Sequence, residues 1–312
     1  MKGKILITDS LFIAKEHEET LTEAGYEIER LDTPEATEDQ FMEAIKGKVG
    51  YILGGTEVLT DKVIDAADEL KAIAFTGIGY KGFIPNYEYV TKKGIAIANT
   101  PDGPTHAVAE WAMTAALAMN RNIFDIGRTG TKKFLTTKGI EGQHVGIVGL
   151  GRIGAEITRM LKPFKPASIS YYSKSRHESS EKELNITYID LESLLQQSEI
   201  VFVCVSDDAG QNFMTEKELG LLKDDALLVS FIHKGIINEA ALLKELQSGR
   251  IRAAMDYPMD TKEANDLPLS RWYSGSGSNA FNTFLEIKLV SDMAVRSLLN
   301  LLEMGHDENR VN

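Results

Sequence analysis

Short apolar runs alternate with longer amphipathic runs along most of the 312 residues, and this alternation restricts the fold more than any other feature. Short apolar runs are typical of buried strands, whereas amphipathic runs are typical of helices. Strands that alternate with helices predict a parallel, doubly wound α/β sheet. Before residue 100 we predict strands at 4–8, 28–31, 51–53, 71–75 and 95–98, and helices at 12–24, 38–45 and 61–67.

A second alternating series follows a break at Thr100-Pro101-Asp102-Gly103-Pro104, where two prolines and a glycine predict a hinge. The length also fits about two domains of roughly 150 residues each. We therefore expect two α/β halves joined near residue 100. In the second half we predict strands at 144–148, 168–172, 200–205, 227–231 and 253–255, and helices at 105–121, 154–161, 191–196, 215–222, 239–247 and 286–304.

Charge and composition exclude several classes of partner. Acidic residues outnumber basic ones 46 to 34, which gives a net charge of −12 and disfavours nucleic acid and anionic lipid as partners. No run reaches the roughly 18 apolar residues of a membrane span, and the N-terminus turns polar too soon for a signal peptide. The single cysteine, Cys204, lies in an apolar run, so we interpret it as a buried hydrophobe rather than a nucleophile. These features predict a cytoplasmic protein.

The motif Gly149-Leu150-Gly151-Arg152-Ile153-Gly154 is the sharpest functional signal. It follows an apolar strand and opens a helix, which is the context of a dinucleotide site. Gly149 would make the tight turn, Gly151 would let the backbone approach a pyrophosphate, and Gly154 would let helix and strand pack closely. The alternative is an ordinary strand–helix turn. We also predict cofactor contacts from Arg152 and Ile153, which lie within the motif, and from Val205, which lies at the end of a later strand.

The end of the next strand predicts which nicotinamide cofactor fits. NAD sites usually place an acidic residue there, about 20 residues after the motif, to accept the ribose hydroxyls. Here the strand ends in Ser173-Lys174-Ser175-Arg176-His177, with no acid before Glu178. Hydroxyl and cationic groups favour a 2′-phosphate, so we predict NADP, with NAD as the alternative. Ser173, Lys174 and Arg176 would surround the phosphate, unless they form only a solvated basic loop.

Several motifs in order resemble the D-isomer-specific 2-hydroxyacid dehydrogenases, a family that includes glyoxylate/hydroxypyruvate reductases. The resemblance runs nearly end to end. Its motifs are Gly77-Ile78-Gly79-Tyr80, Gly94-Ile95-Ala96-Ile97-Ala98-Asn99-Thr100-Pro101, Ala107-Val108-Ala109-Glu110, the segment 144–154, Gly235-Ile236-Ile237-Asn238-Glu239-Ala240-Ala241-Leu242 and Ala253-Ala254-Met255-Asp256.

The resemblance implies two doubly wound parallel-sheet domains, Rossmann-like and flavodoxin-like, with a cleft between them. Residues 1–100 plus 286–312 would form the substrate domain, and 101–285 the NAD(P)-binding domain. A substrate acid group would lie on backbone N–H groups near Ile78 and Gly79. Asp256 would hold the nicotinamide carboxamide, although by its position after a buried strand it could equally be a cap. The resemblance also implies a homodimer.

The family's catalytic arginine, glutamate and histidine are not matched. Alignment places His233 and Lys234 where arginine and glycine belong, and Asn279 nearest to the missing histidine. Asparagine cannot supply the proton that carbonyl reduction needs. An imidazole titrates near pH 6.5, so His233 is a candidate donor, with Lys234 supplying charge. The alternative is that His233 only lines the pocket.

Two functions from different classes remain open at this stage. The first is an NAD(P)-dependent oxidoreductase that transfers hydride to or from a small polar substrate with a rebuilt catalytic set. The second is a catalytically silent NADP(H)-binding sensor or scaffold subunit. The histidines show no metal-ligand spacing, so we predict no metal. The tail at 305–312 is expected to fray.

Overall fold

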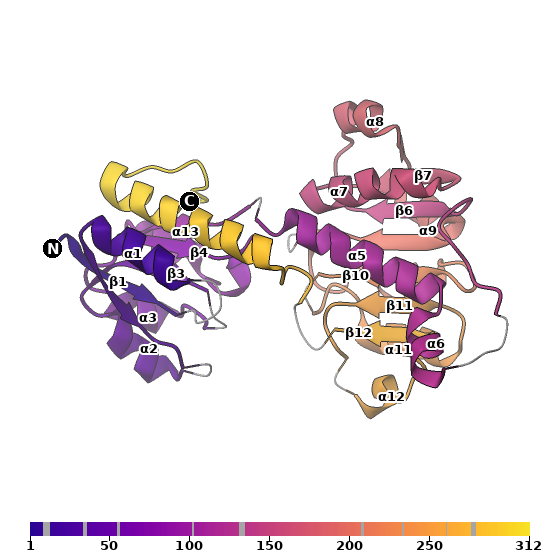
Figure 1. Cartoon of the computed structure of the whole chain (residues 1–312), viewed down its shortest axis with the longest axis horizontal. Helices are drawn as coiled ribbons and strands as arrows, with labels where there is room; N and C mark the ends of the chain where they lie inside the picture. The colour runs from indigo at the N-terminus through magenta and orange to yellow at the C-terminus, as the bar shows by residue number, and fades with distance from the viewer. Residues whose placement is uncertain are drawn as a thin grey trace. The chain divides into compact units, whose positions relative to one another are not determined.

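The computed structural model describes residues 1–8, 13–33, 36–54, 57–101, 103–130, 135–206, 209–232, 234–259, 261–275 and 279–312. The chain divides into two compact units (Figure 1). The N-terminal unit comprises Met1–Pro104 together with Asn282–Asn312, and the C-terminal unit comprises Thr105–Phe281. The chain passes from one unit to the other after Pro104 and again after Phe281, each four residues from the boundaries predicted after residues 100 and 285.

The N-terminal unit is built on a five-stranded sheet in the order β2-β1-β3-β4-β5, and every pair of neighbouring strands is parallel. This confirms the predicted doubly wound fold. The strands are β1 (Gly3–Ile7), β2 (Tyr26–Arg30), β3 (Lys48–Leu53), β4 (Ala72–Phe75) and β5 (Ala96–Ala98). The helices are α1 (Lys15–Glu23), α2 (Glu38–Ile45), α3 (Asp61–Ala66), α4 (Tyr87–Lys92) and α13 (Phe284–Met304), with a 3₁₀ turn, η1 (Tyr80–Gly82).

Both faces of this sheet are covered, which explains uninterrupted apolar runs such as residues 5–7 of the inner strand β1. Successive residues of a strand point to opposite faces. Leu6 packs in a core with α2 and α3 on one face. Its neighbours Ile5 and Ile7 pack in a second core with α1 and α13 on the other face. A strand buried on both faces has no polar side to show in its sequence.

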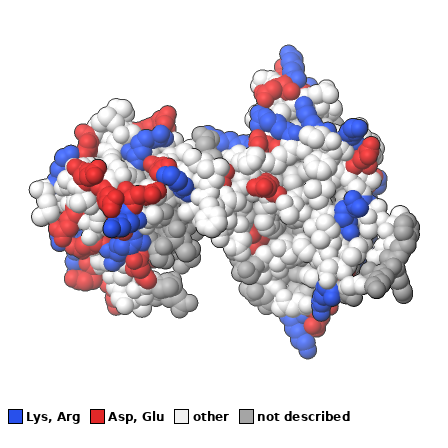
Figure 2. All heavy atoms as spheres, viewed as in Figure 1, with Lys and Arg blue, Asp and Glu red and all other residues white. Residues whose placement is uncertain are grey.

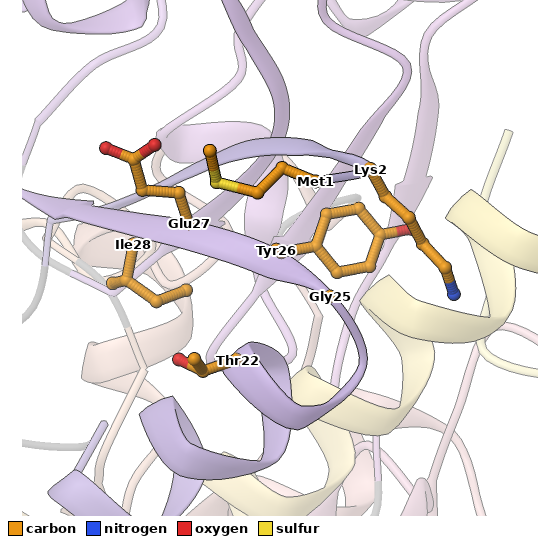
Figure 3. A pocket seen from close by; sticks show the side chains of 7 residues that line it. All are labelled: Met1, Lys2, Thr22, Gly25, Tyr26, Glu27 and Ile28. Carbon is orange, nitrogen blue, oxygen red and sulfur yellow. The ribbon is translucent and has the colours of Figure 1, made fainter.

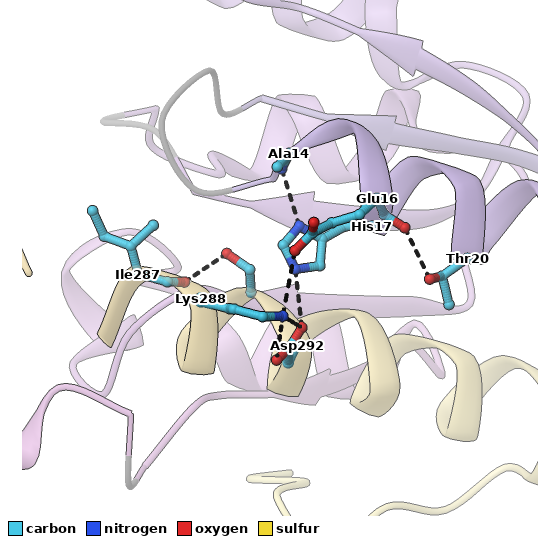
Figure 4. Close-up of polar contacts among 8 residues, drawn as sticks. Ala14, Glu16, His17, Thr20, Ile287, Lys288 and Asp292 are labelled. Atoms are coloured by element: carbon cyan, nitrogen blue, oxygen red, sulfur yellow. Dashed lines mark hydrogen bonds and ion pairs between the residues drawn. The ribbon is translucent and has the colours of Figure 1, made fainter. Parts of the chain in front are cut away.

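A buried histidine links α1 to α13 (Figure 4). The imidazole of His17 is 5% exposed. Its Nδ1 accepts the Ala14 N–H at 3.0 Å, and its Nε2 lies 3.1 Å from Asp292 Oδ1. Because Nδ1 is an acceptor, Nε2 carries the proton and donates it to the carboxylate. One side chain therefore caps α1 and ties it to the closing helix.

The C-terminal tail is ordered against the sheet, so the prediction that it frays is wrong. The Val311 N–H donates to the Ile97 carbonyl at 2.8 Å, and Arg310 forms an antiparallel bridge with Ala98. The Asn312 side chain accepts from the Ile97 N–H at 2.7 Å. The tail thus pairs with β5, which would otherwise be an open sheet edge.

The C-terminal unit is a seven-stranded sheet in the order β12-β11-β10-β9-β6-β7-β8, again with parallel pairs throughout. One core contains residues of α5 and α7, and the core on the other face contains residues of α9 and α11. The strands are β6 (His144–Val148), β7 (Ser168–Tyr172), β8 (Thr187–Tyr188), β9 (Ile200–Val203), β10 (Leu227–Ser230), β11 (Arg252–Met255) and β12 (Trp272–Ser274). The helices are α5 (Thr105–Asn120), α6 (Ile123–Thr129), α7 (Arg152–Leu161), η2 (Lys162–Phe164), α8 (Glu178–Leu184), α9 (Leu191–Gln197), α10 (Glu216–Gly220), α11 (Glu239–Gln247) and α12 (Lys262–Asn265).

Among the described residues, no helix combines the length and the apolar character needed to cross a bilayer. The single cysteine, Cys204, is partly buried and packs beside the core around α5 and α7. Burial raises the pKa of its thiol, which keeps it uncharged. This agrees with its interpretation as a small hydrophobe.

The His17 contact generates a stability prediction. We expect His17→Ala to lower the free energy of unfolding by about 1–3 kcal/mol, because it removes a buried side chain and leaves the Ala14 N–H without its acceptor. Urea denaturation followed by circular dichroism measures this difference. The exposed His306 gives the matched control, His306→Ala, which should change the free energy by less than about 0.5 kcal/mol. Equal effects of the two substitutions would contradict the assignment.

Candidate functional site

The turn between β6 and α7 brings the predicted glycine motif against the end of β9. Gly149 has a φ of 99°, and its N–H donates to the Tyr172 carbonyl at 2.7 Å. A Cβ at this position would lie 2.7 Å from the Cys204 carbonyl oxygen and 2.8 Å from the Val205 nitrogen. The backbone conformation and the crowding both require glycine. Val205, a predicted cofactor contact, therefore lies directly beside the turn.

The other two glycines of the motif have opposite surroundings. A Cβ on Gly154 would lie 2.3 Å from the Gly149 carbonyl oxygen, so the helix approaches the turn as closely as backbone atoms permit. A Cβ on Gly151 would meet no described atom within 4 Å. Gly151 is also the N-cap of α7 and offers no side chain to its first N–H groups. Arg152 and Ile153 occupy the first turn of the helix. The result is an open helix N-terminus that suits a phosphate group.

The end of β7 holds the residues predicted to surround a 2′-phosphate. Ser173 is only 9% exposed, and its Oγ accepts the Leu150 N–H at 2.9 Å. It therefore ties the glycine turn to β7. Lys174 is exposed, and no ion pair or hydrogen bond of its side chain is found within the described part of the chain.

Arg176 is bound by a carboxylate that the sequence analysis did not consider. Its Nε and Nη2 each donate to Glu181 at 2.8 Å. The Tyr171 hydroxyl donates to the same carboxylate at 2.7 Å. The Arg176 guanidinium and this hydroxyl lower the pKa of Glu181 to about 2. Arg176 is therefore neutralised by Glu181, whereas no carboxylate pairs with Lys174 among the described residues.

Asp256 organises the loop that carries Asn279. Asp256 is 2% exposed. Its Oδ1 accepts the Asn279 N–H at 2.8 Å and its Oδ2 accepts the Ala280 N–H at 3.0 Å. Burial raises the pKa of this carboxyl against the opposing effect of these two N–H donors. The geometry matches the capping role left open for Asp256, and it brings together two of the predicted site residues.

The remaining catalytic candidates are His233 and Lys234. His233 lies outside the described residues. Lys234 is exposed, and it precedes Gly235, whose carbonyl accepts the Asn212 N–H at 2.6 Å. Lys234 thus follows the carboxyl end of β10, and Asp256 follows that of the neighbouring β11.

Ile78 and Gly79 lie just beyond the carboxyl end of β4. Asn99 donates through Nδ2 to the Ile78 carbonyl at 3.0 Å, and the Thr100 N–H donates to the Gly77 carbonyl at 2.9 Å. These bonds hold the loop by its carbonyl groups. Within the described residues, neither the Ile78 N–H nor the Gly79 N–H has a hydrogen-bond acceptor. Both donors are therefore available to an anionic group.

A polar chain on the same sheet edge was missed by the sequence analysis. The strand order reverses between β1 and β3, and ligands of open α/β sheets bind beyond the carboxyl ends at such a point. There the hydroxyls of Thr8 and Tyr51 lie 2.8 Å apart. Burial raises the pKa of Glu57 against a hydrogen bond from Thr8, and Glu57 Oε2 is buried without a partner among the described residues. The signal in the sequence was a lone glutamate after a strand, which is indistinguishable from a surface residue.

A surface hollow of about 520 Å³ lies at the opposite, amino end of β1 and β2 (Figure 3). It does not contain any of the predicted site residues. Its lining is Met1, Lys2, Thr22, Gly25, Tyr26, Glu27 and Ile28. Within the described residues, no cluster of three or more histidine, cysteine, aspartate or glutamate side chains could hold a metal ion.

Comparison with known proteins identifies the family. The model of the D-isomer specific 2-hydroxyacid dehydrogenase NAD binding domain matches residues 112–273. The glyoxylate reductase of Thermococcus litoralis is 31% identical over 268 residues, which is 81% of this chain and 79% of that protein. The chain belongs to the D-isomer specific 2-hydroxyacid dehydrogenase family.

This chain is also similar to a second curated relative and, in fold, to a solved structure. The D-3-phosphoglycerate dehydrogenase of Methanocaldococcus jannaschii is 32% identical over 279 residues, covering 85% of this chain and 51% of that protein. The TT0316 protein of Thermus thermophilus has the same fold, with a TM-score of 0.87, 21% identity, and coverage of 99% of this chain and 100% of that chain. The chain is thus a nicotinamide-dependent oxidoreductase of the class that acts on CH–OH groups.

The contrast between Gly151 and Gly154 generates the second prediction. Gly154→Ala should lower the free energy of unfolding by about 1–3 kcal/mol, because the new methyl group would overlap the Gly149 carbonyl. Gly151→Ala should change stability by less than about 1 kcal/mol and weaken dinucleotide binding about 10-fold, because its methyl group fills the open space at the helix N-terminus. Thermal melts and cofactor fluorescence titrations measure the two effects. A Gly151→Ala variant with unchanged cofactor affinity would show that the dinucleotide binds elsewhere.

Proposed function

We propose that this protein is an NADPH-preferring reductase of small 2-oxo acids such as glyoxylate, able to run in the reverse direction on the 2-hydroxy acid. The observation that carries the proposal is the β6–α7 turn, where Gly151 leaves an unobstructed helix N-terminus. The name of the 31% identical relative from Thermococcus litoralis supports the substrate class.

The preference for NADPH rests on the end of β7. A carboxylate here would accept the ribose hydroxyls of NAD and repel a 2′-phosphate. Glu181, an acid of the following helix α8, is held by Arg176 in a two-point ion pair, which offsets the repulsion that its carboxylate would add. Lys174 supplies the uncompensated positive charge, and Ser173 supplies a hydroxyl close to the turn. Arg176 contributes by neutralising Glu181 rather than as a free cation.

Cofactor affinities test this division of roles. Lys174→Glu should weaken NADPH binding about 10-fold or more and leave NADH binding within about twofold, because only NADPH has the 2′-phosphate. Glu181→Gln should strengthen NADPH binding, because it releases the Arg176 guanidinium. Lys182→Gln, which removes an exposed cation of α8, is the matched control. Fluorescence titration of each variant with both cofactors gives the affinities. A wild-type protein that binds NADH more tightly than NADPH would reject the preference.

In the proposed reaction, some groups of this chain bind the substrate and others transfer a proton to it. When bound, the nicotinamide supplies or accepts the hydride at the substrate carbonyl carbon. The N–H groups of Ile78 and Gly79 would hold the substrate carboxylate. The carbonyl oxygen needs a proton as hydride arrives; His233 is the proposed donor, Lys234 adds positive charge, and Asn279 can donate a hydrogen bond. Asp256 fixes the backbone at Asn279 and keeps oxygen lone pairs for the nicotinamide carboxamide.

Turnover assays separate a working enzyme from a silent NADP(H)-binding sensor or scaffold. A general acid contributes about 10²–10⁴-fold to the rate, so His233→Ala should lower kcat for glyoxylate about 100-fold or more while NADPH binding is kept. His177→Ala, outside the proposed catalytic set, is the control. Glu57→Gln tests a second acid, whose Oε2 is buried and which follows the carboxyl end of β3. Tight NADPH binding with no turnover of glyoxylate, hydroxypyruvate or other 2-oxo acids would favour the sensor. A loss of turnover in Glu57→Gln but not in His233→Ala would move the acid to Glu57.

The proposed setting is cytoplasmic, and the proposed assembly is a homodimer formed through the C-terminal unit. In the view of Figure 2, charged side chains crowd the N-terminal unit, whereas the face of the C-terminal unit that includes α5 is largely uncharged. An uncharged face of this kind suits contact with a second copy of the chain.

A further inference from the structure

The C-terminal unit gathers three cationic side chains around a single carboxylate, far from the glycine turn. Asp225 lies two residues before β10, Arg252 opens β11, and Arg271 directly precedes β12. These strands are parallel neighbours, so the three residues share the amino edge of the sheet. Lys138, in the segment before β6, completes the cluster. The glycine turn instead follows the carboxyl end of β6, at the opposite edge.

All three cations are directed at the Asp225 carboxylate. Lys138 Nζ lies 2.7 Å from Oδ2, Arg252 Nε 3.1 Å from Oδ1, and Arg271 Nη1 3.5 Å from Oδ1. No other carboxylate pairs with Lys138, Arg252 or Arg271 within the described part of the chain. Three positive charges thus share one negative charge, which leaves an excess of two.

The excess is costly because part of the cluster is buried. The Arg252 side chain is 8% exposed. Burial lowers the pKa of its guanidinium, and the positive charge of Arg271 lowers it further. Arg252 offsets some of this cost through bonds from Nη2 to Asn120 Oδ1 at 3.0 Å and to the Asp225 carbonyl at 3.2 Å.

Arg271 lacks such compensation. Its Nη1 is buried and has no hydrogen-bond partner among the described residues, and 3.5 Å is too long for a strong bond to Asp225. The rest of the side chain and that of Lys138 are partly exposed, at 34% and 41%. A solvent ion can therefore reach Lys138 and the exposed part of the Arg271 side chain.

We propose that Arg271, Lys138 and Arg252 form a binding site for a small oxyanion, a phosphate or carboxylate group, at the amino edge of the C-terminal sheet. Such an anion would neutralise the excess charge by binding the exposed parts of the Arg271 and Lys138 side chains, since guanidinium and ammonium groups bind carboxylate and phosphate oxygens through charge-assisted hydrogen bonds. The site lies at the sheet edge opposite the cofactor turn, so it can be filled while cofactor is bound.

Thermal melts of the full-length protein saturated with NADPH test the proposal. At constant ionic strength, replacing sodium chloride by inorganic phosphate or by malonate should raise the Tm by ~3 °C at about ten times the dissociation constant. The phosphate and malonate arms show which of the two oxyanions the site prefers. Arg271→Gln should abolish the rise, and Arg159→Gln, which removes an exposed arginine of α7, should keep it.

Two further variants keep the test decisive if Arg271→Gln folds poorly. Lys138→Gln should reduce the rise. Asp225→Asn removes the competing carboxylate and should enlarge it, at least twofold in anion affinity, even if the variant is less stable at the start. A purely structural cluster would not show this gain. No rise in the wild type with either anion, or an equal rise in Arg271→Gln, would overturn the proposal.

Discussion

The C-terminal unit depends on one close approach, that of Gly154 to the carbonyl oxygen of Gly149. A Cβ on Gly154 would lie 2.3 Å from that oxygen, so any other residue would push α7 away from β6. The close approach also fixes where α7 begins, and therefore where its first N–H groups point. Ser173 and Cys204 hold the turn from the neighbouring strands, through the Leu150 N–H and the Val148 carbonyl. Site and scaffold are thus stabilised by the same contacts.

In the N-terminal unit, too, the contacts that stabilise the fold position the candidate binding groups, but the groups are different. Its strands also end at one edge, where some backbone and side-chain hydrogen-bonding groups are fixed in place but lack partners of their own among the described residues. Asn99 and Thr100 fix the loop of Ile78 and Gly79 by its carbonyl groups, which leaves the N–H groups to an anion. Glu57 and Thr8 meet where the strand order reverses. Burial raises the pKa of Glu57, which weakens the repulsion between this acid and an anionic substrate.

The sequence predicted the long buried elements well, because continuous apolar runs and helical periodicity are strong signals. The limits of β6, β7, α2 and α11 match the predictions residue by residue. Short elements were missed: α8 is polar with only Leu184 buried, and β12 has three residues, too few to show a period. The strand predicted at 200–205 ends at Val203, because the next residues turn past Gly149.

The site was predictable only where the backbone dictates the residue. The glycine motif has such constraints, so its spacing, together with the apolar strand before it and the helix after it, located the turn. Side-chain partners were not predicted, whether they are near in sequence, as Glu181 is to Arg176, or distant, as Asn120 and Asp225 are from Arg252. The tail was expected to fray because it is short and polar, yet Val311 and Asn312 pair with β5. Such contacts depend on the folded arrangement and leave no local pattern.

The central claim is that a nicotinamide dinucleotide places its phosphates on the first N–H groups of α7. Hydrogen–deuterium exchange of the peptide containing Gly151, Arg152 and Ile153, with and without NADPH, tests it most directly, since these amides lack helical acceptors. The account predicts that NADPH slows exchange of this peptide about 10-fold or more, with little change in α2 or α3. Saturating NADPH with unchanged exchange at these amides would contradict it.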